Sequence, residues 1–436
     1  MPAASPSAPL SLHRDGDRLE TTAFPVAPFR YYRVSFESSA AEPSMWAAIS
    51  FDREGRQLDA DHYSAYDASD GWAASEFCFR GKAGAVEARL RLHPAEARIR
   101  GIAVGEVARA EVAAWADALW AAMPQLNLAP DPARWRHLPK TAARLEAIGQ
   151  IGRIGPIGPI GDAARLGPIG PIRPIGPMPP LRIVMLGDSI VNDTGNSPYD
   201  VLVERMYPGL SLEVVTSVRG GTGCWYYKEA GRVKGYVLDF QPDLLMIGGI
   251  SHNDDVESIR SVIHQARAAA PGLAGEDCIL VQVRNPGAIR SAIHQVRAAA
   301  PGPGGEDCIL VQVRNPRAAR RPAPACCPGD ALRCSCPDIL LMTGAFGKGR
   351  DPRQLPDWSP TVDPDGDGYR SRLLRLAEEE GAEFFDLEGA WGSYLLGNDR
   401  PYAWFMRDEV HANARGSQLL GRILGRFFAQ NRSGGG

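Results

Sequence analysis

Alternating apolar and polar residues dominate the chain from residue 18 to residue 107. Residues 31–36 and 86–92 alternate with the period of two that turns successive side chains to opposite faces of a β-strand. Turn-forming residues, such as those at 52–55, separate the runs. Several short strands at this spacing predict an all-β, jelly-roll-like sandwich, which we assign to residues 1–107.

A helical period replaces the alternation at residues 109–123 and predicts a helix there. A low-complexity tract of Ile-Gly-Pro units follows at 151–180. Its glycines recur every third residue, but Ala164 and Arg173 break the phase. A collagen helix needs unbroken glycines, so the tract is typical of a polyproline-like linker. We therefore interpret residues 108–180 as a helical connector and linker.

Beyond residue 180, apolar runs alternate with amphipathic segments, which is the pattern of an α/β domain with a parallel sheet. The expected strands are 181–186, 212–217, 243–248, 339–343 and 383–386. The expected helices are 199–207, 256–270, 369–380 and 414–429. This domain is assigned to residues 181–430.

A tandem repeat interrupts the α/β pattern, because residues 259–288 and 289–318 are identical at 25 of 30 positions. The two copies offer candidate strands at 278–283 and 308–313. We interpret residues 271–337 as an insertion. The strand expected to enter the sheet is 339–343, because its apolar run suits burial on both faces.

Composition narrows the classes of protein. The 436 residues are 44% hydrophobic and 23% charged, in the range of soluble globular proteins, and the net charge of −3 gives no reason to expect a nucleic acid or an anionic membrane as partner. No apolar run reaches the length of a membrane span. Residues 1–20 lack the apolar core of a signal peptide, so we expect either a cytoplasmic protein or a secreted form whose leader has been trimmed.

The first expected strand of the α/β domain runs directly into Gly187-Asp188-Ser189. A serine there presents its hydroxyl at the carboxyl edge of a parallel sheet, where ligands bind in open α/β folds. Residue 191 is Val, so this is not the G-x-S-x-G elbow of the α/β-hydrolases. Taken alone, such a serine can simply cap a helix.

Near the far end, Asp408 and His411 form an Asp-x-x-His motif just before the last expected helix. This spacing puts carboxylate and imidazole on the same side of the chain. The carboxylate can then hold the Nδ1 proton while Nε2 faces a serine. The same motif alone is often an exposed charge pair. Together with Ser189 it predicts a triad, with Ser189 as nucleophile, His411 as base and Asp408 orienting His411.

The blocks around Ser189 and Asp408 resemble the first and last signature blocks of the SGNH (GDSL-type) hydrolase superfamily. The resemblance implies a flavodoxin-like, three-layer α/β fold and a serine esterase. It also implies two donors to the oxyanion: a glycine N–H after the second strand, Gly221 with Gly220 as the alternative, and the side chain of Asn253 after the third. Ser251 departs from the family pattern, which has glycine two residues before the asparagine.

The sandwich resembles the carbohydrate-binding-module-like domains that precede some carbohydrate esterases, although a docking domain without sugar binding is the alternative. Candidate substrate contacts lie beside the signature blocks: Trp225, Tyr226, His252 and Trp404. Core packing is the alternative role for the aromatic residues, and a polar loop position is the alternative for His252.

We therefore expect a serine esterase that hydrolyses acyl esters, foremost acetyl esters on a carbohydrate, through an acyl-enzyme and without cofactor or metal. One alternative within the family is a lipase, arylesterase or thioesterase acting on another small ester. An alternative from a different class is a carbohydrate-binding protein whose hydrolase domain is disabled by the insertion. The acidic run at 363–367 resembles the start of a calcium loop, but Leu374 stands where that loop needs Glu, so we expect a turn.

Overall fold

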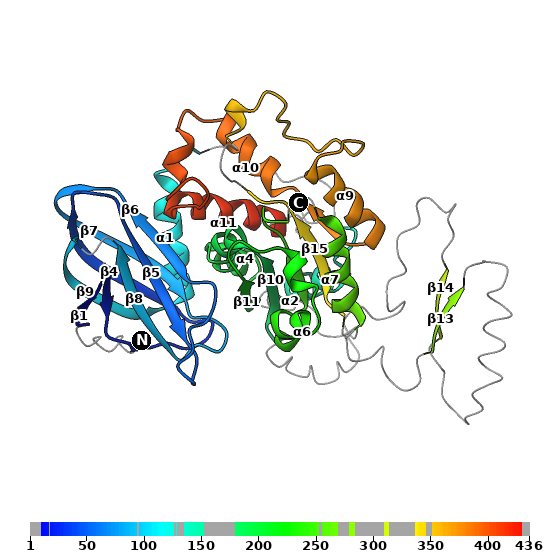
Figure 1. The fold of residues 1–436 in the computed structure, drawn as a ribbon, viewed down its shortest axis with the longest axis horizontal. Helices are drawn as coiled ribbons and strands as arrows, with labels where there is room; N and C mark the ends of the chain where they lie inside the picture. The colour runs from blue at the N-terminus through cyan, green and yellow to red at the C-terminus, as the bar shows by residue number, and fades with distance from the viewer. Residues whose placement is uncertain are drawn as a thin grey trace, which may run out of the picture.

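The computed structural model describes residues 10–16, 18–93, 96–125, 128, 135–151, 179–252, 255–268, 279–283, 309–313, 336–345 and 351–429. Within these residues, an antiparallel β-sandwich lies beside a unit with a parallel sheet and helices (Figure 1). Helix α1 (Arg109–Ala121) connects the two and packs against helices of the α/β unit.

The sandwich consists of two antiparallel sheets. Its strands are β1 (Leu12–Asp15), β2 (Arg18–Thr21), β3 (Phe24–Pro25), β4 (Tyr31–Ala40), β5 (Ser44–Phe51), β6 (His62–Tyr66), β7 (Ser69–Arg80), β8 (Glu87–His93) and β9 (Arg98–Val107). One sheet has the order β1-β2-β8-β5-β6 with β3 paired to β8, and the other has the order β7-β4-β9. Every second residue of β8 is buried, as the alternation predicts. These side chains meet Trp46 of β5 and Phe77 of β7 in a core between the sheets.

The α/β unit is built on five parallel strands. They are β10 (Leu181–Gly187), β11 (Leu212–Val218), β12 (Leu244–Ile247), β15 (Asp338–Met342) and β16 (Glu383–Phe385). Their spatial order is β11-β10-β12-β15-β16. The second strand therefore lies outside the first, and the direction of winding reverses between β10 and β12. In sheets of this kind, ligands bind at the carboxyl ends of the two strands on either side of the reversal, which here are β10 and β12.

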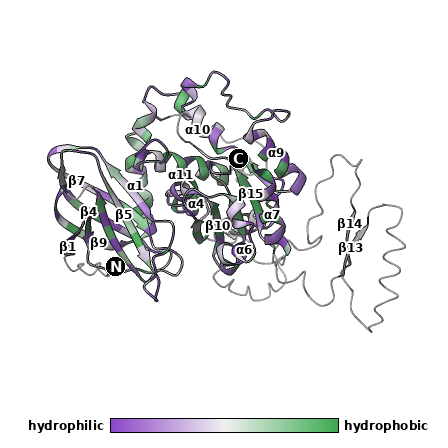
Figure 2. Cartoon of the chain, in the orientation of Figure 1, coloured by the Kyte–Doolittle hydropathy of each residue, from purple (hydrophilic) through white to green (hydrophobic). Residues whose placement is uncertain are grey.

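Helices cover both faces of this sheet. They are α3 (Ser189–Gly195), α4 (Tyr199–Met206), α5 (Cys224–Tyr227), α6 (Arg232–Tyr236), α7 (Val256–Ala268), α9 (Tyr369–Glu380), α10 (Leu387–Leu396) and α11 (Ala414–Ala429), with α2 (Pro139–Ile151) from the connector. Because strand residues alternate between faces, Ile183 and Met185 of β10 join the core beneath α10 and α11. Val184 and Leu186 join the core beneath α7 and α9. β10 and β15 are accordingly apolar along most of their length (Figure 2).

All five strands predicted for the α/β unit are confirmed to within a residue or two, as are its four predicted helices. β15 enters the sheet, as expected for 339–343. The described repeat strands, β13 (Ile279–Val283) and β14 (Ile309–Val313), pair with each other in parallel, each residue opposite its own copy. The glycine tract at 152–178 and the second repeat helix lie outside the described residues. Among the described helices, none is both long and apolar enough to cross a membrane.

A buried ion network joins the sandwich to the α/β unit. Asp200, at the start of α4, is fully buried and accepts from Arg80 of β7 at 2.9 Å and from Arg109 of α1 at 2.7 Å. The hydroxyl of Tyr31 in β4 donates to the same carboxylate at 2.5 Å. Burial alone would raise the pKa of Asp200, but the two guanidinium groups hold it below its usual range. A buried charge without partners is costly, so the network ties α4 to the sandwich.

Residues 271–335 should be dispensable for the parallel sheet, since β15 pairs with β12 and β16 while β13 and β14 pair only with each other among the described strands. Cys336 is buried, so the deletion variant keeps it. Joining residue 270 to residue 336 through a short Gly-Ser turn should preserve a single cooperative melting transition, within a few degrees of the parent by calorimetry. An insoluble variant, or one without a cooperative transition, would mean that the repeat contributes to the core.

Candidate active site

Ser189 lies at the point where the sheet reverses its winding. It follows the last residue of β10 and begins α3, whose N-cap is Asp188. Its side chain is half-buried. The apolar strand LRIVML is held between two cores, so its carboxyl end is fixed and the serine is presented at the edge of the sheet.

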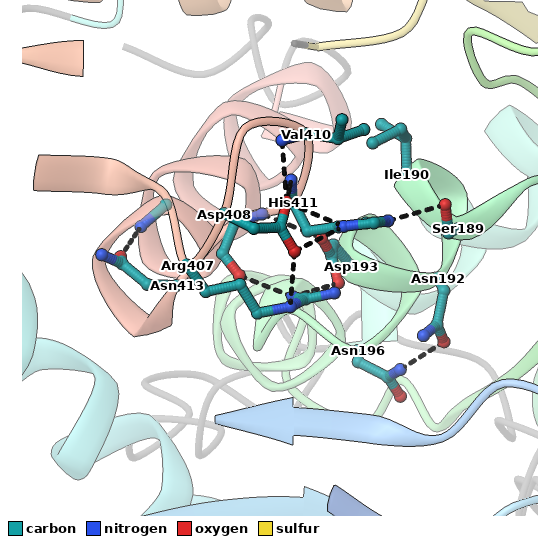
Figure 3. A network of polar contacts seen from close by, with 12 residues as sticks. Ser189, Ile190, Asn192, Asp193, Asn196, Arg407, Asp408, Val410, His411 and Asn413 are labelled. Atoms are coloured by element: carbon teal, nitrogen blue, oxygen red, sulfur yellow. Dashed lines mark hydrogen bonds and ion pairs between the residues drawn. The ribbon is translucent and has the colours of Figure 1, made fainter. Parts of the chain in front are cut away.

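Three side chains predicted from distant parts of the sequence meet at this edge (Figure 3). The Nε2 atom of His411 lies 2.8 Å from the Oγ atom of Ser189. Its Nδ1 atom lies 2.8 Å from Oδ2 of Asp408. The structure therefore brings Ser189, His411 and Asp408 into one chain of hydrogen bonds, in the geometry that lets an imidazole accept a proton from a serine hydroxyl.

Asp408 is held ionised by its own loop. Its Oδ1 atom accepts the backbone N–H groups of Val410 and His411, each at 2.8 Å. Partial burial opposes ionisation, but these N–H groups and the His411 ring hold the pKa of the Asp408 carboxyl below its usual range. An ionised Asp408 keeps the proton of His411 on Nδ1, so the lone pair of Nε2 points at Ser189.

Asp188 has a role that the sequence did not reveal. One oxygen of its buried carboxylate accepts from the N–H of Ile190 at 2.9 Å. The other accepts from the N–H groups of Ile250 and Ser251 in the loop after β12, both at 2.7 Å. Asp188 thus fastens that loop to the turn that carries Ser189. Gly249 makes the approach feasible, because a Cβ at that residue would lie 2.6 Å from the carboxylate.

His252 does not have the position predicted for a substrate contact. Its side chain is only 1% exposed. Nε2 bonds to the carbonyl of Gly248 at 2.8 Å, and Nδ1 accepts from the N–H of Cys224 at 3.3 Å. Burial lowers the pKa of His252, which favours a neutral ring with its proton on Nε2. The correction is that His252 joins the loop after β12 to the start of α5 and has no ring nitrogen left for a substrate.

The loop after β11 holds the predicted glycine of the oxyanion site. Gly221 has a φ of +67°, a conformation that favours glycine. The hydroxyl of Tyr227 fixes this loop against β10, accepting from the N–H of Arg219 at 2.8 Å and donating to the carbonyl of Gly187 at 2.6 Å. Asn253, the other predicted donor, lies outside the described residues, so its role stays a prediction.

Sequence reasoning missed Gly223 in the same loop. A Cβ on Gly223 would lie 2.8 Å from the carbonyl oxygen of Ser251 and 3.0 Å from Nδ1 of His252. Glycine is therefore required where the loops after β11 and β12 meet. Nothing in the pattern of three glycines in four positions distinguishes this one, because the requirement comes from a contact across the fold.

The aromatic candidates differ in how accessible their rings are. The guanidinium of Arg232 lies 3.7 Å from the ring centre of Tyr226. That of Arg415 lies 4.6 Å from the ring of Trp404. Both rings are partly buried and already engaged by cation–π contacts, which argues against a sugar stacking on them.

Trp225 is the exception, because its side chain is 39% exposed. Its indole N–H donates to the carbonyl of Ser251 at 3.2 Å. The ring is thereby fixed beside the two loops that adjoin Ser189. A fixed and exposed indole next to the candidate site is suited to pack against an apolar or sugar surface.

No group of three potential metal ligands occurs among the residues that the structure describes. The acidic run at 363–367 forms a turn before α9, in which the N–H of Asp365 bonds to Asp363 at 3.0 Å. Arg375 of α9 donates to the carbonyls of Pro364 and Gly366 at 2.6 and 2.8 Å. The carbonyl groups of this turn therefore accept hydrogen bonds from the guanidinium group of Arg375.

Comparison with known proteins gives neither a matching protein-family model nor a matching curated protein. Among solved structures, the chain resembles a two-domain esterase (CEX) active on acetylated mannans at 12% identity and a TM-score of 0.32, over 59% of this chain and 51% of the esterase. The chain thus matches about half the length of that enzyme.

Two further neighbours are similarly distant. A variant of Axe2, an acetyl-xylooligosaccharide esterase from Geobacillus stearothermophilus, matches at 18% identity and a TM-score of 0.30, over 56% of this chain and 91% of Axe2. The YxiM protein from Bacillus subtilis matches at 14% identity and a TM-score of 0.29, over 93% of this chain and 78% of YxiM.

The contact between Gly249 and Asp188 can be tested by Gly249→Ala. With φ at +113° and no room for Cβ, the variant should lose about 2 kcal/mol or more of its free energy of unfolding in urea. Gly235→Ala in α6 is the matched control, because no atom lies within 4 Å of its added Cβ, and it should be neutral or slightly stabilising. Equal stability of the two variants would contradict the proposed contact.

Proposed function

We propose that the chain is a serine esterase of the SGNH type that hydrolyses acyl esters, foremost acetyl esters. The observation that carries the proposal is the hydrogen-bonded series Ser189–His411–Asp408 at the winding reversal of the sheet. The strand order, with the second strand outside the first, is that of flavodoxin-like sheets and supports the SGNH assignment. In this proposal residues 181–430 form the hydrolase domain, residues 1–107 the sandwich and residues 108–180 the connector.

The proposed reaction passes through an acyl-enzyme. Ser189 Oγ attacks the ester carbonyl carbon while His411 Nε2 takes the hydroxyl proton. The tetrahedral intermediate collapses, and His411 returns that proton to the departing alcohol oxygen. A water molecule then attacks the acyl-enzyme, again giving its proton to His411, and the carboxylic acid leaves as Ser189 regains the proton. No cofactor enters either half of this reaction.

The proposed oxyanion donors come from three loops. They are the N–H of Ser189, a glycine N–H in the loop after β11, and the side-chain amide of Asn253. Gly221 remains the proposed glycine, and Gly223 joins it as a candidate because it packs against the loop that leads to Asn253. Asp188, His252 and Tyr227 hold the described parts of the loops after β11 and β12. Donors fixed in advance are effective because they need no reorganisation as charge develops.

We propose that the substrate is a carbohydrate that carries the ester group. Two features support it: the resemblance of the sandwich to carbohydrate-binding-module-like domains, and the exposed indole of Trp225 beside the candidate site. Aromatic rings of this kind provide the flat apolar surface on which pyranose rings pack. The acylated carbohydrate is therefore the proposed partner.

Ser189→Ala and His411→Ala should each lower kcat/KM for a chromogenic acetyl ester by at least about a thousandfold, with an unchanged melting temperature. Asp408→Asn should also lose activity, because an amide no longer favours the required tautomer. Ser359→Ala removes an exposed hydroxyl and serves as control. Activity retained by Ser189→Ala would contradict the proposal.

Trp225→Ala tests the carbohydrate assignment. For acetylated manno- or xylo-oligosaccharides, KM should rise about tenfold, equivalent to ~1.4 kcal/mol of lost stacking, while KM for a small chromogenic ester stays within about twofold. Leu396→Ala is the control, because Leu396 is an apolar side chain of comparable exposure, 48%, that lies on α10 and outside the sandwich. An equal KM change for both substrates would exclude a sugar-specific role for Trp225.

A further inference from the structure

Arg407 is a buried residue that the proposed reaction does not use directly. It precedes Asp408 and its side chain is only 6% exposed. Its Nη1 atom donates to Oδ1 of Asp193 at 2.8 Å and to the carbonyl of Ala412 at 2.6 Å. Its backbone N–H donates to the carbonyl of His411 at 2.9 Å. Arg407 thus bonds across the loop that carries Asp408 and His411 and holds its two ends together (Figure 3).

Asp193 connects this loop to the helix of Ser189. It lies one turn after Ser189 on α3 and is 5% exposed. Besides Arg407, its carboxylate accepts the backbone N–H of Ala412 at 2.9 Å. The residues on either side of the Asp-x-x-His motif are therefore both bonded to the nucleophile's own helix. A buried ion pair with these additional hydrogen bonds fixes geometry, since neither partner can leave without exposing an unpaired charge.

The sandwich contacts both halves of this arrangement. The ring of Tyr63 in β6 lies 4.9 Å from the guanidinium carbon of Arg407. Two residues earlier, the carbonyl of Asp61 accepts from the side-chain amide of Asn192 on α3 at 2.8 Å. Asn192 is bonded in turn to Asn196 on the same face of the helix (Figure 3). One short sandwich segment therefore contacts the helix of Ser189 and the residue that shapes the loop of His411.

We propose that the sandwich is a positioning element for the reaction: Asp61 holds the helix of Ser189, and Tyr63, acting through Arg407, holds the loop of His411. Tyr63, Arg407 and Asp193 are positioning residues, because none of them contacts Ser189 or the ring of His411. Arg407 meets the triad only at Asp408, where its Nε atom lies 3.9 Å from Oδ2. The inference rests on the proposed function and adds a reason for the sandwich to be joined to the α/β unit. Displacement of a base by about 1 Å can cost a hundredfold in rate, so such support is consequential.

The test compares kcat per active site in four variants of the full chain. Sites are counted by titration with a fluorophosphonate, which separates a slower enzyme from a smaller folded fraction. Tyr63→Ala should lower kcat for 4-nitrophenyl acetate about tenfold and Arg407→Gln about a hundredfold, with KM within about twofold. Tyr63→Phe should restore kcat, because a phenyl ring keeps the contact with the guanidinium. Arg407→Lys should have a kcat between those of the wild type and Arg407→Gln, because a lysine keeps the charge but cannot form the planar fork of hydrogen bonds.

Asp67→Asn is the matched control. Asp67 joins the sandwich to α11 through Arg415 at 3.4 Å, does not touch the His411 loop, and is 87% exposed. The Asp67→Asn variant should have the same kcat as the wild type. A tenfold loss in this variant too would overturn the proposal, because general loosening of the interface would then explain the effect of Tyr63→Ala.

Hydrogen exchange of peptides covering residues 406–413 gives a readout that does not depend on activity. Exchange should accelerate in Tyr63→Ala and Arg407→Gln but not in Tyr63→Phe or Asp67→Asn. If the wild-type chain hydrolyses no ester, the proposed function fails while exchange still tests the positioning. If the wild type is active and Tyr63→Ala keeps both its kcat and its exchange protection, the positioning role is wrong. Tyr63→Ala decides this even where Arg407→Gln does not fold.

Discussion

A single carboxylate, that of Asp188, holds the candidate site together. It is buried at the winding reversal of the sheet and accepts backbone N–H groups from two different segments, the first turn of α3 and the loop after β12. A buried carboxylate is costly unless hydrogen bonds satisfy it, so both segments are held where they can supply those bonds. The place of Ser189 and that of Ile250 and Ser251 in the loop after β12 both follow from this one group.

The second constraint is the union of the sandwich with the α/β unit. It combines a buried apolar cluster with a buried ion network, in which Asp200 pairs with Arg80 and Arg109. Apolar surfaces can slide over one another at small cost, whereas buried charges and directed hydrogen bonds are satisfied in one arrangement. The interface contains α4 and reaches α3, the helix that begins with Ser189. The accuracy of the docking therefore bears on the candidate site itself.

The sequence predicted the features that depend on local pattern. The strands of the α/β unit are apolar runs bounded by turns, and β10 and β15 were found because burial on both faces requires such runs. Ser189, Asp408 and His411 were found because each stands at a fixed distance from a strand end or a helix start. Helix α10 was missed because its apolar residues are spread around the helix and form no periodic face.

What the sequence could not supply are contacts between segments far apart in the chain. The burial of His252 and the cation–π partners of Tyr226 and Trp404 depend on which loops and helices meet in the fold. The same is true of Asp188, which reads as part of a local motif but bonds to residues more than sixty positions away. In each case a short-range pattern identifies the residue type, and the tertiary structure decides its use.

The distance along the chain between Ser189 and His411, 222 residues, has a consequence for biosynthesis. Domains fold from the N-terminus as the chain leaves the ribosome. In the proposed mechanism, the nascent chain therefore presents its serine hydroxyl long before the imidazole that would activate it has been translated. On that proposal, the serine becomes reactive in one late event, when the segment after α10 that carries Asp408 and His411 emerges and packs on α3.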